Sequence, residues 1–165
     1  MTNTTFITVD NLKEFTPVTE NMDYTTIQSF ISVGEGLWIY DVLGTALTSS
    51  LLQMIENQTL SGDSLNLVTS YIVPAACWYT LYESSVFLIY RTENKGLTKK
   101  YSDNSQALDK QEFAIYRQSV LDKANYFRNR LIRFLDDNQS LYPLYRASGS
   151  CNNNSRMDFS GGIYV

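Results

Sequence analysis

Residues 113–134 have the sequence FAIYRQSVLDKANYFRNRLIRF, and this stretch decides the fold more directly than any other part of the chain. Apolar side chains recur there three or four residues apart, which is the repeat of one face of an α-helix. They are Phe113, Tyr116, Val120, Ala124, Phe127, Leu131 and Phe134. Charged and amide side chains occupy the other faces, so the pattern predicts a long amphipathic helix that ends near Asp137.

A second apolar run, YIVPAACWYTLYESSVFLIY, occupies residues 71–90. It is apolar on almost every side, as the central helix of a bundle is. The run is long enough to cross a bilayer, but Glu83 and several hydroxyl groups would be costly at hydrocarbon depth. We therefore predict a buried core helix and no association with a membrane. This helical region follows a turn at residues 57–62, with Asp63 as its expected N-cap, and Pro74 is expected to kink or restart it.

The N-terminal part of the chain predicts shorter elements. Residues 4–9 are rich in β-branched side chains, which is typical of a short strand. Asp10 is the expected cap of a brief helix that ends at Phe15. In the longer helix that follows, Gly34 and Gly36 weaken the helical conformation by roughly 1 kcal/mol each. These two glycines therefore predict that a neighbouring element approaches the helix closely.

The complete pattern predicts a mainly α fold, a four- to five-helix bundle. A Leu-Gly pair that ends at Gly44 marks a break between two helices. Short β pieces are expected near the N-terminus, in a polar excursion at residues 92–106, and at the C-terminus. Residues 1–146 are expected to form one helical domain, and residues 147–165 a C-terminal arm.

The composition removes several classes of enzyme. The chain has no histidine, so Ser-His-Asp and Cys-His groups and the HExxH zinc motif are excluded. Its two cysteines, Cys77 and Cys151, cannot make a four-ligand zinc site. The Gly-rich stretches at residues 34–36 and 161–162 lack the strand–turn–helix setting of a phosphate loop. We therefore predict a protein that is not an enzyme, with no catalytic residue, no cofactor and no metal.

Charge is distributed unevenly along the chain. Residues 1–82 contain eight acidic residues and one lysine, a net charge of −7, whereas residues 83–165 contain nine acidic and twelve basic residues, a net charge of +3. The split is either an accident of helix faces or the mark of a molecule with unlike ends that associates head to tail with its own copies. In the second case Arg117, Arg128 and Arg133 are the candidate contacts with a partner.

The C-terminal arm, ASGSCNNNSRMDFSGGIYV, is rich in Ser and Asn until its last seven residues. Two interpretations stay open, a disordered tail and an arm whose final strand adds to a sheet of a partner. The return of apolar and β-branched residues after the glycine pair favours the second. We predict that Phe159, Ile163 and Tyr164 are buried against a neighbouring chain.

The order of elements resembles that of a known family. The segments that carry the resemblance are LWIYDVLGTAL at residues 37–47, NRLIRFL at residues 129–135, the Tyr142-Pro143 pair and the final Gly-Ile-Tyr-Val. Together they resemble the head–tail adaptor, or connector, proteins of tailed bacteriophages, in the versions found in crAss-like gut phages. The resemblance implies a small helical adaptor domain without catalytic activity that forms a homo-oligomeric ring, twelve-fold in this family, in the neck of the virion.

That resemblance also implies partners and a location. The ring would bind the portal protein and other neck or tail proteins, after synthesis in the cytoplasm of the host bacterium. DNA would pass through it without stable binding, which agrees with an isoelectric point near 4.8. The alternative, of a different class, is a small cytoplasmic helical protein that binds or acts on a small ligand.

Overall fold

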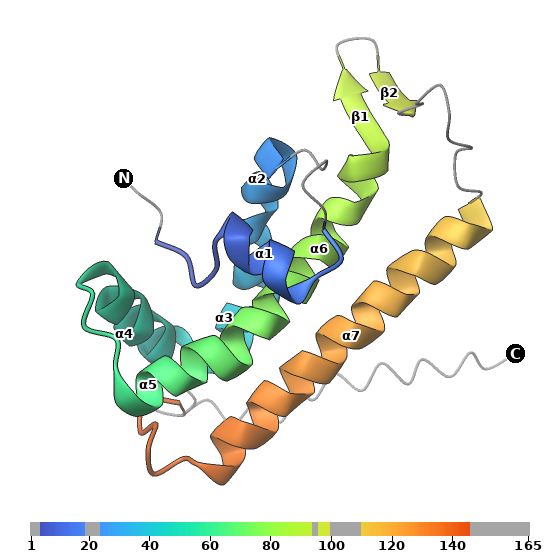
Figure 1. The fold of residues 1–165 in the computed structure, drawn as a ribbon. Coiled ribbons are helices and arrows are strands. Elements are labelled where there is room, and N and C mark those ends of the chain that lie inside the picture. Colours follow the sequence, from blue (N-terminus) through green and yellow to red (C-terminus); the bar gives the residue numbers. More distant parts are fainter. Residues whose placement is uncertain (1–3, 19–23, 94–95, 100–109, 146–165) are drawn as a thin grey trace, which may run out of the picture.

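The computed structural model of the chain describes residues 4–18, 24–93, 96–99 and 110–145 (Figure 1). Helices make up most of these residues, which confirms the mainly α prediction. In chain order the elements are α1 (Val9–Phe15), α2 (Tyr24–Gly34), η1 (Glu35–Ile39), α3 (Tyr40–Leu43), α4 (Thr45–Glu56), α5 (Gly62–Leu67), η2 (Val68–Ile72), α6 (Val73–Ile89), β1 (Tyr90–Glu93), β2 (Gly96–Lys99) and α7 (Lys110–Asp137).

Helix α6 is the centre of the molecule, with α2 packed on one side and α7 on the other (Figure 1). Its middle is completely buried, including the large side chain of Tyr79. The buried hydroxyls of Ser84 and Ser85 donate hydrogen bonds to backbone carbonyls one turn earlier in the same helix, so their burial leaves no unpaired donor. The predicted core helix is thus confirmed. In the described part of the chain, no helix combines the length and the hydropathy of a membrane span.

Pro74 explains the irregular helix that precedes α6. Proline has no N–H group, and its ring collides with the carbonyl four residues earlier, which is that of Ser70. The chain widens into the π-helical segment η2 over these residues, and the N–H of Val73 donates to the carbonyl of Val68, five residues back. Pro74 itself lies in the first turn of α6, where a proline is tolerated.

The predicted break at Gly44 is confirmed, and two predicted caps are wrong. Gly44 has φ 75°, a conformation that favours glycine, and it separates α3 from α4. Ser61, and not Asp63, is the N-cap residue of α5, while Asp63 lies in the first turn, where its negative charge still favours the helix. Thr8, and not Asp10, caps α1 through a capping box with Asn11.

The predicted strand at residues 4–9 is wrong. Residues 4–8 have no regular structure, and Val9 already belongs to α1. The backbone N–H groups of Phe6 and Ile7 donate to a side chain far along the sequence, as described below, and not to a second strand. Strands β1 and β2 form an antiparallel hairpin in which Tyr90 pairs with Lys99 and Glu93 with Gly96. The C-terminal β piece and most of the 92–106 excursion lie outside the described residues.

Helix α7 has the length and the buried face that its apolar repeat predicts. Val120, Ala124, Leu131 and Leu135 are buried against α6 and η2. At the far end of the helix the Tyr71 and Phe134 rings stack with centroids 3.9 Å apart. The segment after α7 is held by Tyr142, whose hydroxyl donates to the carbonyl of Asp63 at 2.8 Å.

Candidate functional site

One candidate interaction surface is the exposed face of α2 and η1, which we call the α2 face. Its members are Thr25, Gln28, Ser29, Ser32, Val33, Gly36 and Leu37, all exposed and none charged. Two members of this face are large exposed apolar side chains, Leu37 at 61% and Val33 at 38%. Depletion of charge around exposed apolar side chains is characteristic of the centre of a protein–protein interface. The α2 face therefore has the composition of a contact surface.

The two glycines of this region have different surroundings. A Cβ atom on Gly34 would lie 2.9 Å from the backbone nitrogen of Thr80 in α6, so the close approach predicted for Gly34 is confirmed. The same prediction for Gly36 is wrong within the described chain, because a Cβ atom there would meet nothing within 4 Å. Gly36 thus lies on the α2 face and leaves room there for an approaching backbone.

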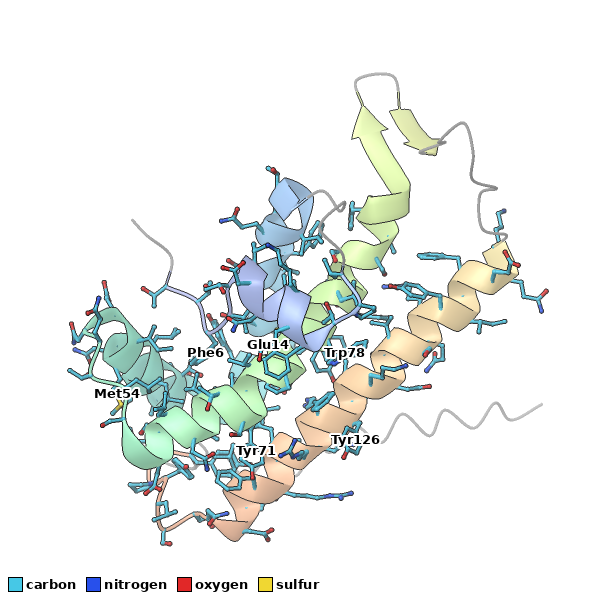
Figure 2. All side chains as sticks on the ribbon, viewed as in Figure 1. Phe6, Glu14, Met54, Tyr71, Trp78 and Tyr126 are labelled. Atoms are coloured by element: carbon cyan, nitrogen blue, oxygen red, sulfur yellow. The ribbon has the colours of Figure 1, made fainter. Side chains whose placement is uncertain are left out.

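A second candidate surface is the outward side of α7, which we call the α7 face. Residues 115, 119, 122, 126, 129 and 133 lie on it at spacings of three and four, and all six are exposed. Ile115 and Tyr126 are 65% and 64% exposed, and Tyr126 points away from the body of the molecule in Figure 2. Arg133 lies on the same face. Tyrosine and arginine are the side chains that interfaces favour.

The structure separates the three candidate arginines. Arg133 is on the α7 face, whereas Arg117 and Arg128 lie on the flank of α7 that faces the body of the protein. The Arg117 guanidinium is 4.3 Å from the centre of the Tyr82 ring. Arg128 pairs with Asp41 of α3, with 3.7 Å between Nη2 and Oδ2. The three candidates of the C-terminal arm, Phe159, Ile163 and Tyr164, lie outside the described residues.

Two further cations of α7 lie over aromatic rings of the η2–α6 helix. Lys123 is 5.6 Å from the centre of a Trp78 ring, and the Arg130 guanidinium is 4.9 Å from that of Tyr71. Such pairs contribute roughly 0.5–1 kcal/mol each at exposed sites. Four basic residues of α7 are therefore engaged within the molecule: Arg117, Lys123, Arg128 and Arg130.

The most unusual polar group of the described chain is Glu35, the first residue of η1, whose side chain is fully buried. Its Oε1 accepts hydrogen bonds from the N–H groups of Phe6 at 2.8 Å and Ile7 at 3.0 Å. The hydroxyl of Tyr40 lies 3.1 Å from the other oxygen, Oε2. Both carboxyl oxygens are thus occupied by the protein itself, and Glu35 joins the N-terminal segment to η1 and α3.

Burial sets the protonation of this group. Loss of hydration raises the pKa of Glu35 from 4.5 to about 7, against the opposing effect of the hydrogen bonds from Ile7, Tyr40 and Phe6. Burial and the nearby Glu35 carboxylate also raise the pKa of the Tyr40 hydroxyl and of the Cys77 thiol. A thiol with a raised pKa is a poor nucleophile, and Cys77 is buried in the core as a small apolar side chain.

Aromatic and polar contacts fix η1 on α6. The Trp38 ring stacks on Tyr79 with centroids 4.5 Å apart, and its Nε1–H donates to Glu83 at 2.8 Å. The Tyr79 hydroxyl in turn donates to Asn125 of α7 at 2.7 Å. Within the described ranges, no three Cys, Asp or Glu side chains gather as a metal site. Through these hydrogen bonds Glu83 connects α6 with η1, and Tyr79 connects α6 with α7.

Comparison with known proteins identifies the family of the chain. The profile of a family of unknown function, DUF6712, matches residues 39–155. The chain belongs to the DUF6712 family. No curated protein and no solved structure matches it. The DUF6712 region includes the α7 face and all three candidate arginines, whereas α2, Gly36 and Glu35 precede it.

Sequence reasoning missed Glu35, although a signal was present. Glu35 follows Ile27 and Ile31 at spacings of four residues, and Ile39 follows it by the same interval. The acid is thus on the apolar stripe of its helix, a position where a carboxylate needs partners. Because Gly34 and Gly36 flank it, this segment was compared with a phosphate loop, and the position of Glu35 on the apolar stripe was not considered. The partners, Phe6 and Ile7, could not be recognised because their own sequence is typical of a strand.

Proposed function

We propose that this DUF6712 protein is a non-enzymatic structural component of a phage virion. In this proposal it forms a homo-oligomeric ring in the neck, joins the portal to downstream tail components, and lets DNA pass. The resemblance to head–tail adaptors supplies the biological setting. The observation that carries the proposal is the pair of exposed faces, one on α2–η1 and one on α7, on opposite sides of the central helix α6.

Two unlike faces on opposite sides of one molecule allow a repeating contact. If the α2 face of one copy meets the α7 face of the next, each of the two copies has its other face left for a further neighbour. Such heterologous contacts form a closed ring when the rotation between copies closes. The apolar centres of the two faces, Val33 with Leu37 and Ile115 with Tyr126, are the groups expected to be desolvated there.

The charge split adds long-range steering to this contact, since the α2 face itself carries no charge. The α2 face belongs to the acidic part of the chain and the α7 face to the more basic part. Because Arg117 and Arg128 have partners within the molecule, the contribution of charge falls mainly on Arg133. We expect Arg133→Glu to slow assembly, and the triple reversal at Arg117, Arg128 and Arg133 to add damage to the fold itself.

The C-terminal arm is proposed as a second contact. In the ring, Phe159, Ile163 and Tyr164 would dock on a neighbouring chain, where a short tether raises the local concentration of the docking segment. Deletion of residues 158–165 should leave the helical content of the protein intact and impair assembly. Normal assembly of the truncated protein would show that the arm has no docking role.

Solution mass measured by native mass spectrometry, with and without the portal protein, tests the ring. The variants Leu37→Ser and Tyr126→Ser should prevent assembly, because each places a hydroxyl in a contact that needs apolar surface. Leu65→Ser on α5 is the matched control, since Leu65 is 43% exposed but belongs to neither face. A wild-type protein that stays monomeric in the presence of the portal would overturn the proposal and favour the ligand-binding alternative.

The proposed passage of DNA also requires that the protein does not bind DNA stably. A channel for DNA should not hold its cargo, and a net charge of −4 gives little counterion release on binding. We expect no salt-sensitive complex with duplex DNA in an electrophoretic mobility assay at micromolar protein. Tight binding that weakens steeply with salt would contradict this part of the proposal.

A further inference from the structure

The N-terminal segment is attached to the body by a side chain that can change its charge. Residues 4–8 have no regular structure, yet the side chains of Phe6 and Ile7 are buried in the core (Figure 2 labels Phe6). Their two N–H groups donate to one atom, Oε1 of Glu35, which is 28 residues beyond Ile7. The Phe6 ring also meets the Tyr40 ring edge to face, with centroids 6.0 Å apart. The N-terminal segment thus packs against Glu35 and Tyr40.

The geometry fits a neutral carboxylic acid. In that form the carbonyl oxygen Oε1 still accepts both N–H groups. The Tyr40 hydroxyl, which donates to Oε2 of the carboxylate, can turn and accept from Oε2 once that oxygen is protonated. Every hydrogen bond is kept and no net charge is buried. In the ionised form the same atoms enclose a full negative charge, and in the described part of the chain no cation pairs with it. A buried unpaired charge is costly.

We propose that Glu35 is a pH-controlled latch for residues 4–8: the segment is docked when the carboxyl group is protonated, and it is released when the group ionises and becomes hydrated. This device does not depend on the proposed ring. It connects the position of the N-terminus to the protonation of a core residue.

Among the described residues, the titratable groups coupled to the latch carry no positive charge. Tyr40 comes from α3, Cys77 from α6, and Glu14 of α1 acts on Cys77 in turn. Each is neutral or negative, so none of them stabilises an ionised Glu35 by charge. Since burial raises the pKa of Glu35 from 4.5 to about 7, the docked form gains on the order of a hundred-fold over the released form when the proton is bound.

Nuclear magnetic resonance of the full chain tests the latch directly. The side-chain carbon of Glu35 reports its ionisation, and the hydrogen-exchange protection of the Phe6 and Ile7 amides, relative to intrinsic rates, reports docking. As pH rises from 4.5 to about 7, this protection should fall on the order of a hundred-fold, and it should level off above the Glu35 titration. The amide of Val120 in the middle of α7 is the internal control and should keep its protection.

The variant Glu35→Gln separates the latch from a general effect of pH. Its amide oxygen can accept the two N–H groups and its NH2 group can donate to Tyr40, but it cannot ionise. Protection in this variant should stay constant with pH. A decrease equal to that of the wild type, or a wild-type protection that is flat across the Glu35 titration, would overturn the proposal. If Glu35→Gln does not fold, Tyr40→Phe provides the second test. The hydrogen bond of Tyr40 lowers the pKa of Glu35, so its loss should move the Glu35 titration to higher pH and deepen the loss of Phe6 and Ile7 protection above pH 7. A moved titration with unchanged protection would refute the link.

Discussion

Helix α6 is packed on two sides in two different ways. Towards α2 the contact is close and depends on the absence of a side chain: Gly34 leaves only enough room for the backbone of Thr80. Towards α7 the contact is made by large side chains, among them the stacked pair of Tyr71 and Phe134. Cation–ring pairs such as Arg117 with Tyr82 complete that side.

The difference shows where the fold tolerates change. On the α2 side a single added atom meets backbone, which cannot rotate away, and the adjoining residue Glu35 buries a carboxyl group. On the α7 side the stability is divided among many contacts, and the outer ends of the side chains can adjust. We therefore expect single changes on the α2 side to have larger effects than single changes on the α7 side.

The largest expected effect concerns pH and Glu35. Its folded-state pKa of about 7 lies above the 4.5 of an unfolded chain, so the folded state binds the proton more tightly. The related stability is present below pH 4.5 and is lost as pH rises through 7, by about 3 kcal/mol in total. Because other acids titrate as well, the measurement is the difference in the free energy of unfolding between wild type and Glu35→Gln. This difference should grow in favour of Glu35→Gln from pH 4.5 to pH 8.5, and a constant difference would contradict the assignment.

The next effect compares the two glycines. Gly34→Ala should lower the free energy of unfolding by about 2 kcal/mol, because the new methyl group forces α2 and α6 apart. Gly36→Ala is its matched control, two residues away in open space, and should raise the free energy by up to about 1 kcal/mol through better helix propensity. Urea unfolding of both variants is sufficient. Equal effects of the two substitutions would refute the close contact of α2 with α6.

Smaller effects are expected on the α7 side. Arg117→Met, Lys123→Met and Arg130→Met each keep the apolar stem of the side chain but remove the cation over a ring. Each should cost about 0.5–1 kcal/mol in thermal or urea unfolding. Arg133→Met is the control without a ring partner among the described contacts and should leave stability unchanged. A cost at Arg133 equal to the other three would mean that these cations act by general charge and not through the rings.

The same contrast explains how much of the molecule could be predicted from its sequence. The α7 repeat, the apolar α6 run and the break at Gly44 depend on local spacing and conformation, and these were predicted correctly. The burial of Glu35 and the absence of a strand at residues 4–9 depend on a partner 28 residues away. Local patterns contain no information about that partner, so a β-branched segment was assigned to a strand that does not form.

The candidate surface shows the same limit. Arg117, Arg128 and Arg133 have similar sequence surroundings, but only Arg133 is on the exposed α7 face. The other two are engaged by Tyr82 of α6 and Asp41 of α3, elements whose position beside α7 is a result of the tertiary fold. Composition could suggest candidate contact residues, and the arrangement of α2, α6 and α7 was needed to show which of them are exposed.

Chemical cross-linking between copies tests the central claim, that the α2 face of one copy meets the α7 face of the next. The substitutions Gln28→Cys and Asn129→Cys, at exposed polar positions of the two faces, are combined in one chain with Cys151→Ser, while Cys77 is buried and protected. With a short bismaleimide under assembly conditions, the double variant should give a ladder of covalent oligomers, and each single variant should stay monomeric on a denaturing gel. Covalent dimers from a single variant, or an assembled double variant without a ladder, would contradict a heterologous contact through these faces.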